Sequence, residues 1–485
     1  MMTECLPRRD SSKCTPFASL RKAGDKIMAA ATTAIVLLSV SVPRGVAQEK
    51  ATRQPITLEQ AIHRALAKNP QLQSAEDTAK AAAARADAAK AAWLPRVDLS
   101  EGFTRGNNPV FVFGTLLEQQ SFTAANFDLG RLNTPTPLNN FQTRVDGQML
   151  LFDSGQTRNR TQGAKQAKSA ADFQKEQARQ DLILRVVEAY YGVVVARENA
   201  TASTTALQAA EANEHRAEQM QKAGLIVDSD LLSAKVFTAQ MRDREIRAEN
   251  GVQLARLALG RELGMAPGIQ PDATAALNEP TMDVKAVEDW EKAALEQRPV
   301  LQAAQMAREA AGSERRSAKA EFGPKIGVFA DVERDSLSFA GNGGSNWTAG
   351  AQVKFNLFAG GADKARLNEA QANENKAQHD LEWMKSGVLL EVQQAYLGTQ
   401  AAKQRASAAR DSADQAQESL RIIQNRYVAG LTTITELLRA ESAQLDARSA
   451  YLSAVYDWHT TLAELEHSAG TLTPDAALLQ GEKQP

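Results

Sequence analysis

The chain has 485 residues, of which 43% are hydrophobic and 24% charged, and its formal net charge is −2. This composition excludes a disordered or collagen-like chain, and a nearly neutral protein is poorly suited to neutralising nucleic-acid phosphates. Only five histidines, two cysteines and 5% aromatic residues are present. A zinc or iron–sulfur site and the large compact core of an ordinary soluble enzyme are therefore both poorly supported.

Residues 1–47 have the three-part pattern of a secretory signal peptide. A basic stretch at residues 21–26 precedes an apolar run at residues 27–40, and small residues follow up to Ala47. We expect cleavage near Ala47. An uncleaved membrane anchor is the alternative, although the apolar run is short for a spanning helix. No later stretch reaches 18 consecutive apolar residues, so no transmembrane helix is expected.

The remainder of the chain carries one pattern twice. Similar stretches recur 229 positions apart at Pro70 and Pro299 and at Pro95 and Pro324, and 206 positions apart at the Ala-Gly-Leu triplets of residues 223–225 and 429–431. The change of offset means that one loop is longer in the first copy. We expect a first repeat within residues 48–280, a second within residues 281–470 and a tail at residues 471–485.

Each copy predicts a helix, a β-hairpin and then two very long helices. Thr57-Leu-Glu-Gln60 is a capping box that opens the first helix. Residues 156–222 contain no proline and place apolar residues at helical spacing, and residues 362–428 repeat this pattern. About 67 residues at ~1.5 Å each give roughly 100 Å of helix. The glycine of each Ala-Gly-Leu ends the helix, and the returning helices are expected to start near Asp228 and Thr433.

Two windows, residues 103–152 and 322–358, hold twelve of the fifteen phenylalanines and the alternating runs. In residues 346–358 one face carries Trp347, Ala349, Ala351, Val353, Phe355 and Leu357, and the other carries Asn346, Thr348, Gly350, Gln352, Lys354 and Asn356. Strands of ~9–11 residues with one apolar face fit a transmembrane β-barrel. An antiparallel sheet over a soluble core is the alternative. We expect Val328 and the apolar face to meet lipid, and Asp331, Gln352 and Lys354 to meet water.

Four strands per chain are too few for a closed barrel, because about eight is the practical minimum. An open sheet cannot lie in lipid, since its edges would leave backbone groups unpaired. The barrel must therefore be assembled from several chains. Two chains would supply eight strands and three would supply twelve, and periodicity does not choose between them.

Four aromatic residues lie at one end of these strands. Trp93 and Phe322 precede the first strand of each hairpin, 229 positions apart, and Phe152 and Phe358 are expected to end the second strands. This position is typical of the aromatic girdle at a membrane interface. Caps of a core where strand meets helix are the alternative.

The duplicated order of helix, hairpin and long helical hairpin behind a signal peptide resembles the TolC-like outer-membrane efflux proteins. The Gly-Leu turn followed by Asp-Leu-Leu-Ser-Ala (residues 230–234) or Glu-Leu-Leu-Arg-Ala (residues 436–440) is also similar to that family, and residues 108–127 resemble its longer first external loop. The resemblance implies a mainly α fold with two transmembrane β-hairpins. It also implies a homotrimer with a 12-stranded barrel in the outer membrane and a 12-helix tunnel through the periplasm.

The resemblance further implies two functional regions. The turns that would meet a periplasmic adaptor comprise Lys222, Ala223, Gly224 and Leu225, and Val428, Ala429, Gly430 and Leu431. The residues that would narrow the pore comprise Glu436 and Arg439, with Asp228 and Asp230 as the acids of the first repeat. Family members have a second acid where this chain has Arg439. Plain helix caps are the alternative for both regions, because Thr433-Ile-Thr-Glu436 is itself a capping box.

We expect a passive export channel of a tripartite efflux or type I secretion system, with an adaptor and an inner-membrane pump as partners, and no enzyme. A periplasmic coiled-coil adaptor or a cell-envelope structural protein are the alternatives. No cofactor or metal is expected, and the scattered histidines are interpreted as solvated helix positions. Gly341-Asn-Gly-Gly344 is interpreted as the external turn of the second hairpin, since it lacks the setting of a phosphate loop.

Overall fold

The computed structural model describes residues 52–476 except residues 267 and 283. The expected signal peptide at residues 1–47 and most of the expected tail at residues 471–485 lie outside this described part. None of the helices in the described part combines the length and the hydropathy that crossing a bilayer would require.

Ten α-helices are described, and two of them are far longer than the rest. In chain order they are α1 (Leu58–Lys68), α2 (Pro70–Ala91), α3 (Pro109–Glu118), α4 (Leu129–Asn133), α5 (Gln156–Lys222), α6 (Asp228–Glu262), α7 (Val287–Gln297), α8 (Pro299–Ala320), α9 (Ala362–Val428) and α10 (Ile434–Ser468). Helices α5 and α9 each have 67 residues, with the bounds that the sequence predicts. The predicted starts of α6 and α10 are confirmed as well.

Local chemistry explains where the helices begin and end. The Thr57 side chain accepts a hydrogen bond from the Gln60 amide, which confirms the predicted capping box of α1. Asn69 Oδ1 accepts from the Gln71 amide, so α2 starts at Pro70 directly after α1. Gly224 and Gly430 both have φ of +73°, a left-handed conformation that stops α5 and α9.

The strands form two sheets. Strands β1 (Thr52–Ile56) and β4 (Ile269–Ala273) pair in parallel, which the sequence did not predict. The four-stranded sheet is antiparallel in the order β2-β3-β5-β6, with β2 (Arg96–Gly106), β3 (Leu138–Phe152), β5 (Lys325–Ser336) and β6 (Gly343–Lys354). The prediction that the last strand reaches Phe358 is wrong. Lys354 pairs with Lys325, the first residue of β5, so the chain beyond Lys354 has no strand to pair with.

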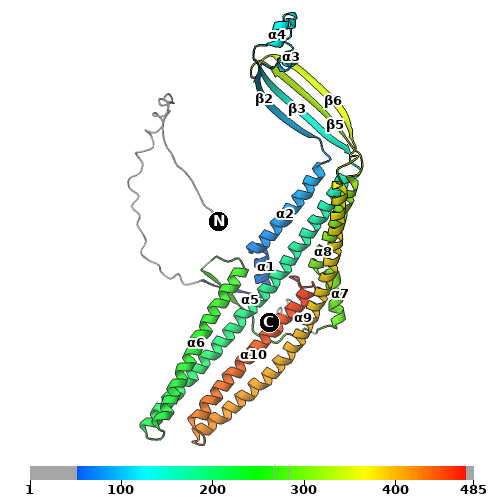
Figure 1. Ribbon diagram of the computed structural model, residues 1–485. Helices are drawn as coiled ribbons and strands as arrows, with labels where there is room; N and C mark the ends of the chain where they lie inside the picture. The colour runs from blue at the N-terminus through cyan, green and yellow to red at the C-terminus, as the bar shows by residue number, and fades with distance from the viewer. Residues whose placement is uncertain (1–51, 267, 283, 477–485) are drawn as a thin grey trace, which may run out of the picture. The chain divides into compact units, whose positions relative to one another are not determined.

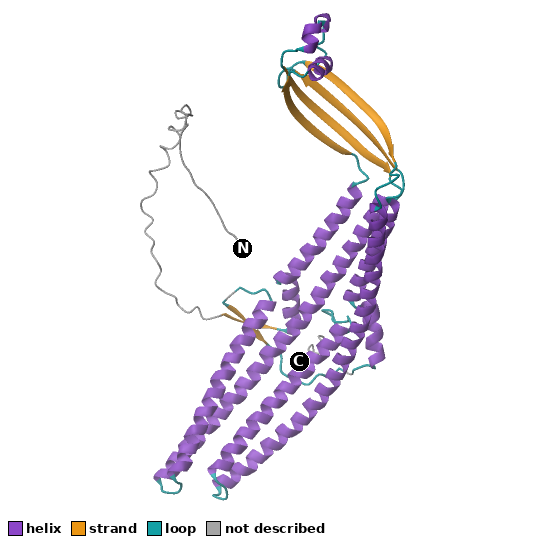
Figure 2. Cartoon of the chain, in the orientation of Figure 1, coloured by secondary structure: helices purple, strands orange, loops and turns teal. Residues whose placement is uncertain are grey.

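The long helices lie side by side in a layer that extends away from the four-stranded sheet (Figures 1 and 2). Near the sheet, α2 packs on α5, and α8 packs between α5 and α9. Farther from the sheet, α6 packs on α5, α5 packs on α10, and α10 packs on α9. Helix α9 is therefore one edge of the layer throughout, and α2 and then α6 form the other edge.

The two largest apolar clusters join helices of both repeats. The larger one joins α1, α5, α6 and α10 through fully buried residues that include Ile62, Tyr190, Leu259 and Leu462. The second lies toward the turns at the far end of the long helices and includes Met241, Tyr427 and Leu437. Repeat one and repeat two thus share both clusters, which fixes the α5–α6 hairpin against the α9–α10 hairpin.

Candidate channel surfaces and hairpin turns

One face of the four-stranded sheet is apolar and exposed. The strand register places Leu99 opposite Val145, Val145 opposite Val332, and Val332 opposite Trp347, so an apolar row crosses all four strands. Leu99 is 73% exposed and Trp347 76%. A continuous exposed apolar surface of this kind marks contact with lipid or with another protein.

The opposite face is polar and internally paired. Arg144 on β3 lies 3.3 Å from Asp331 and 3.4 Å from Glu333, both on β5. Gln142 donates to Glu333 and to Asp335 at 3.3 and 3.2 Å. The strand alternation therefore places Asp331 on the polar face and Val328 on the apolar face, as the sequence predicts.

The four predicted interface aromatics lie where the sheet meets the helices. Phe152 is the last residue of β3, and Trp93 and Phe322 lie in the short connections before β2 and β5. Phe358 lies beyond the end of β6 rather than in the strand. Phe152, Phe322 and Phe358 are exposed, and Trp93 is half-buried.

The two Ala-Gly-Leu turns have the same hydrogen-bond pattern. The Leu225 amide donates to the Met220 carbonyl at 2.9 Å, and the Leu431 amide donates to the Arg426 carbonyl at 2.8 Å. These bonds satisfy helix-end carbonyls without using the leucine side chains. Leu225 is 70% exposed and Leu431 68%. The flanking residues Lys222, Ala223, Val428 and Ala429 are exposed as well, so both turns present apolar side chains that the fold itself does not need.

Glu436 and Arg439 pair on the exposed side of α10. Arg439 Nη1 donates to Glu436 Oε1 at 3.1 Å. The buried positions of this helix end, Ile434, Leu437 and Leu438, face the rest of the chain, so the pair points away from it. Thr433 Oγ1 accepts from the Glu436 amide at 3.4 Å. The N-cap expected from the sequence is thus present, while the Glu436 carboxylate binds Arg439.

The first-repeat acids lie in the first turn of α6. Asp228 Oδ1 accepts from Gln221 Nε2 at 3.0 Å, which ties the start of α6 to the end of α5. The Asp230 amide donates to the Val227 carbonyl at 3.0 Å. Carboxylates at a helix start also interact favourably with the helix dipole.

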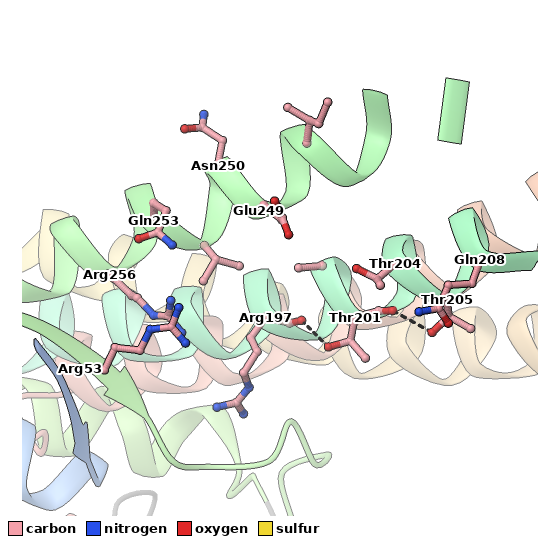
Figure 3. A pocket seen from close by; sticks show the side chains of 13 residues that line it. Arg53, Arg197, Thr201, Thr204, Thr205, Gln208, Glu249, Asn250, Gln253 and Arg256 are labelled. Carbon is pink, nitrogen blue, oxygen red and sulfur yellow. Dashed lines mark hydrogen bonds between the residues drawn. The ribbon is translucent and has the colours of Figure 1, made fainter. Parts of the chain in front are cut away.

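A hollow of about 730 Å³ lies between α5, α6 and β1, with three arginines around it (Figure 3). Arg197 on α5 donates to the Ala273 carbonyl, and Arg256 on α6 donates to Asp272 Oδ1 at 2.9 Å. Arg53 on β1 also lines the hollow. Two of the three guanidinium groups therefore bind β4 and hold it against the long helices. We interpret the hollow as part of this structural contact.

The prediction that the histidines occupy solvated helix positions is wrong for two of them, His459 and His467. His459 is buried, stacks on Tyr191 with ring centroids 3.9 Å apart, and places Nε2 2.7 Å from the Asn278 carbonyl oxygen. Its burial lowers its pKa. His467 Nε2 lies 2.7 Å from Asp181 Oδ1. Both residues join α10 to other segments. Among the described residues, no group of three or more potential ligands could hold a metal.

Glu441 is a buried acid that sequence reasoning missed. It lies on α10, is 7% exposed, and its Oε1 accepts from Asn213 Nδ2 on α5 at 2.5 Å. Its Oε2 is buried and has no hydrogen-bond partner among the described residues. Burial raises the pKa of Glu441 to about 7, and the Asn213 bond opposes this rise.

A sheet with one apolar face, continued by antiparallel helices of roughly 100 Å, is the fold of an outer-membrane channel subunit. The sequence matches the family described as "Outer membrane efflux protein" over residues 61–265 and 290–471, so the chain belongs to that family. Protein CyaE of Bordetella pertussis is 26% identical over 422 residues, with 86% of this chain and 84% of CyaE covered. The alkaline protease secretion protein AprF of Pseudomonas aeruginosa is 24% identical over 417 residues, covering 84% of this chain and 83% of AprF.

A solved structure shares the fold. The CmeC outer membrane channel of Campylobacter jejuni superposes with a TM-score of 0.73 at 18% identity and covers 88% of both chains. The predicted family and the mainly α fold with two β-hairpins are confirmed by these likenesses.

Proposed function

We propose that three copies of the chain form a passive duct through the outer membrane and the periplasm. The observation that carries the proposal is that the sheet and the helical layer both end in unpartnered edges. Strands β2 and β6 each pair on one side only within the described chain. In lipid each unpaired backbone group costs several kcal/mol, so the sheet must close with other copies. Three copies supply twelve strands and, at each level, twelve helices.

The edge helices carry the matching surfaces. Exposed apolar side chains form a stripe of Leu232, Val236, Ile246, Leu254 and Leu257 on α6, and a stripe of Trp383, Leu390, Leu397 and Ile422 on α9. Trp383, Leu390 and Leu397 are seven residues apart, the spacing of a coiled-coil seam. Away from the sheet α6 and α9 lie at opposite edges, so the α9 of one copy meets the α6 of the next there, and nearer the sheet it meets the α2 of the next. Such a head-to-tail contact closes into a ring when the copies are related by a closed rotation, which is three-fold in this proposal.

The two faces of the sheet then meet different media. The row from Leu99 to Trp347 would face lipid, and the Arg144–Asp331–Glu333 network would face the water-filled lumen. Trp93, Phe152, Phe322 and Phe358 would lie at the periplasmic interface of the membrane, because the helices start at that end of the sheet.

The hairpin turns are proposed as the docking site of the periplasmic adaptor. They lie at the ends of α5 and α9, roughly 100 Å of helix away from the sheet. Leu225 and Leu431 are exposed although each follows a completed helix cap, so their side chains are free for a partner. Residues 222–225 and 428–431 make up this docking site.

Glu436 and Arg439 are proposed to narrow the pore just past these turns. Their pair faces away from the rest of the chain, and three-fold symmetry would bring three such pairs around one axis. Asp228 and Asp230 would add acids of the first repeat to the same end. Within one chain the Glu436–Arg439 pair stabilises the helix by only ~0.2–0.5 kcal/mol. An interaction that holds the pore closed must therefore come from contacts between copies.

Cargo would be chosen by the inner-membrane pump, because a wide polar lumen has little selectivity of its own. The name of AprF concerns secretion of a protease, which favours type I secretion beside efflux of small molecules as a function of this chain. An adaptor or an envelope scaffold would not need two β-hairpins with an exposed apolar face. No catalytic role is proposed.

Fractionation and bilayer recording test the proposal together. We expect the protein in the outer-membrane fraction, as a trimer that heating in detergent dissociates, and as a conducting channel in planar lipid bilayers. A monomer in the periplasmic fraction, or a membrane protein without conductance under any voltage, would contradict it.

A further inference from the structure

A cavity of about 430 Å³ lies between the two helical hairpins of one chain. Its lining comes from all four long helices and includes Ala206 of α5, Phe237 of α6, Leu420 of α9 and Glu441 of α10. The volume is within the roughly 300–1,000 Å³ of small-molecule sites, and the alanines, Phe237 and Leu420 give it an apolar wall.

Glu441 is a buried acid of this lining that can still accept a hydrogen bond. Asn213 occupies Oε1, while Oε2 is buried and unpartnered among the described residues. The other charged groups of the lining are Asp414 on α9 and Arg448 on α10, and Arg448 lies over the Tyr451 ring, 5.6 Å from its centroid. Gln444 donates to Gln417 at 2.9 Å, so these two amides already pair with each other. A carboxylate oxygen buried without a partner is costly unless a cation or a donor meets it.

We propose that this cavity binds a hydrophobic organic cation, an amine whose ammonium group pairs with Glu441 and whose apolar body lies against Phe237 and the alanine wall. An ammonium group supplies both the charge and the N–H donors that Oε2 lacks. The apolar part of the lining, formed by the alanines, Phe237 and Leu420, fits the body of such an amine. Because the raised pKa of Glu441 is about 7, a bound cation also keeps this carboxyl ionised at neutral pH.

A ligand bound in this cavity would restrain movement of the α5–α6 hairpin relative to the α9–α10 hairpin. The cavity is formed by α5 and α6 on one side and by α9 and α10 on the other, so a ligand inside it contacts both hairpins. Any movement of α9–α10 away from α5–α6 would open the cavity and release those contacts. A cation bound there therefore favours the arrangement described here over one in which the hairpins separate.

Titration of the whole protein in lipid nanodiscs with 4-phenylbutylamine tests the proposal, with 4-phenylbutan-1-ol as the neutral probe of the same shape. We expect saturable binding of the amine, at least ten-fold weaker binding of the alcohol, and tighter amine binding at pH 8 than at pH 6. Glu441→Gln should weaken amine binding at least ten-fold, whereas Glu418→Gln, at an exposed acid of α9 that pairs with Arg421 of its own helix, should leave it unchanged.

Ala206→Leu provides a second variant that keeps Glu441 but fills part of the cavity, and it should also weaken amine binding. Equal amine binding by the wild type and Glu441→Gln would overturn the proposal, and so would equal binding of amine and alcohol. If Glu441→Gln fails to assemble, unchanged binding by Ala206→Leu would overturn it instead.

Discussion

Arg439 Nη1 donates to Glu436 Oε1 at 3.1 Å, one turn after the start of α10 and on the side of the helix that faces away from its own chain. Both side chains are more than half exposed, so within one chain the pair contributes little to stability. Its position beside the turn at Leu431 makes it a candidate contact between copies rather than a support of the fold.

Glu436→Ala and Arg439→Ala should each raise single-channel conductance, because each removes one partner of a ring of acid–base pairs. The double variant should add little to either single variant if the two residues act as one latch. Planar-bilayer recording measures all three. Unchanged conductance in both single variants would leave Glu436 with the role of a helix-start residue only.

Replacing Leu225 and Leu431 with Asp should abolish export in cells while leaving trimer assembly intact. Both side chains are exposed, and the hydrogen bonds of the turns use backbone atoms, so the fold does not depend on them. Export assays and trimer yield are measured side by side. Loss of the trimer would show that the leucines are structural instead.

Ala349→Arg should reduce trimer yield in the outer membrane, while Thr348→Arg, at the next residue of the same strand, should have a mild effect. Ala349 pairs with Ala330 on the apolar face and Thr348 pairs with Asp331 on the polar face. Arginine at the lipid-facing midplane of a β-barrel costs about 2–4 kcal/mol.

Cysteine labelling checks the same assignment without adding charge. A water-soluble thiol reagent should label Lys354→Cys in intact membranes and should not label Val353→Cys. Equal labelling of the two positions would contradict the assignment of the faces.

Stability should depend on Glu441 in a defined pH window. Its pKa is raised from 4.5 to about 7 by burial, so the folded state holds this proton more tightly than the unfolded state does. The contribution of Glu441 to stability is therefore greatest below pH 4.5 and is lost as the pH rises toward 7. Glu441→Gln should melt at a higher temperature than the wild type at pH 8, with this advantage shrinking at pH 4.5. The same difference at both pH values would contradict the assignment.

The first and last residues of the two long helices could be predicted because no helix-breaking residue interrupts the sequence between them. Residues 156–222 and 362–428 contain no proline, and a glycine with positive φ ends each one. The end of β6 was predicted wrongly because the alternation continues through Phe355 and Leu357 after the partner strand has ended. Periodicity reports the pattern of one strand and carries no information on its neighbour.

Contacts between individual side chains that lie far apart in the sequence could not be predicted. Asn213 and Glu441 are 228 positions apart, and neither carries a local pattern. His459 was interpreted as solvated because a single histidine in a helix has no signature of its own, yet it stacks on Tyr191. The pairing of β1 with β4 likewise joins two strands of five residues each, which are too short to show a clear alternating pattern in the sequence.

The central claim, a ring closed by α9 of one copy against α6 of the next, is tested most directly by a disulfide between Leu257→Cys and Leu397→Cys. The two positions lie in the exposed stripes, at similar distances along the chain from the turns at Leu225 and Leu431. The native cysteines, Cys5 and Cys14, precede the expected cleavage site. We predict that mild oxidation in membranes converts the double variant into covalent dimers and trimers, while each single variant stays monomeric in denaturing gels. A double variant that remains monomeric, although both thiols react with a small reagent, would contradict the account.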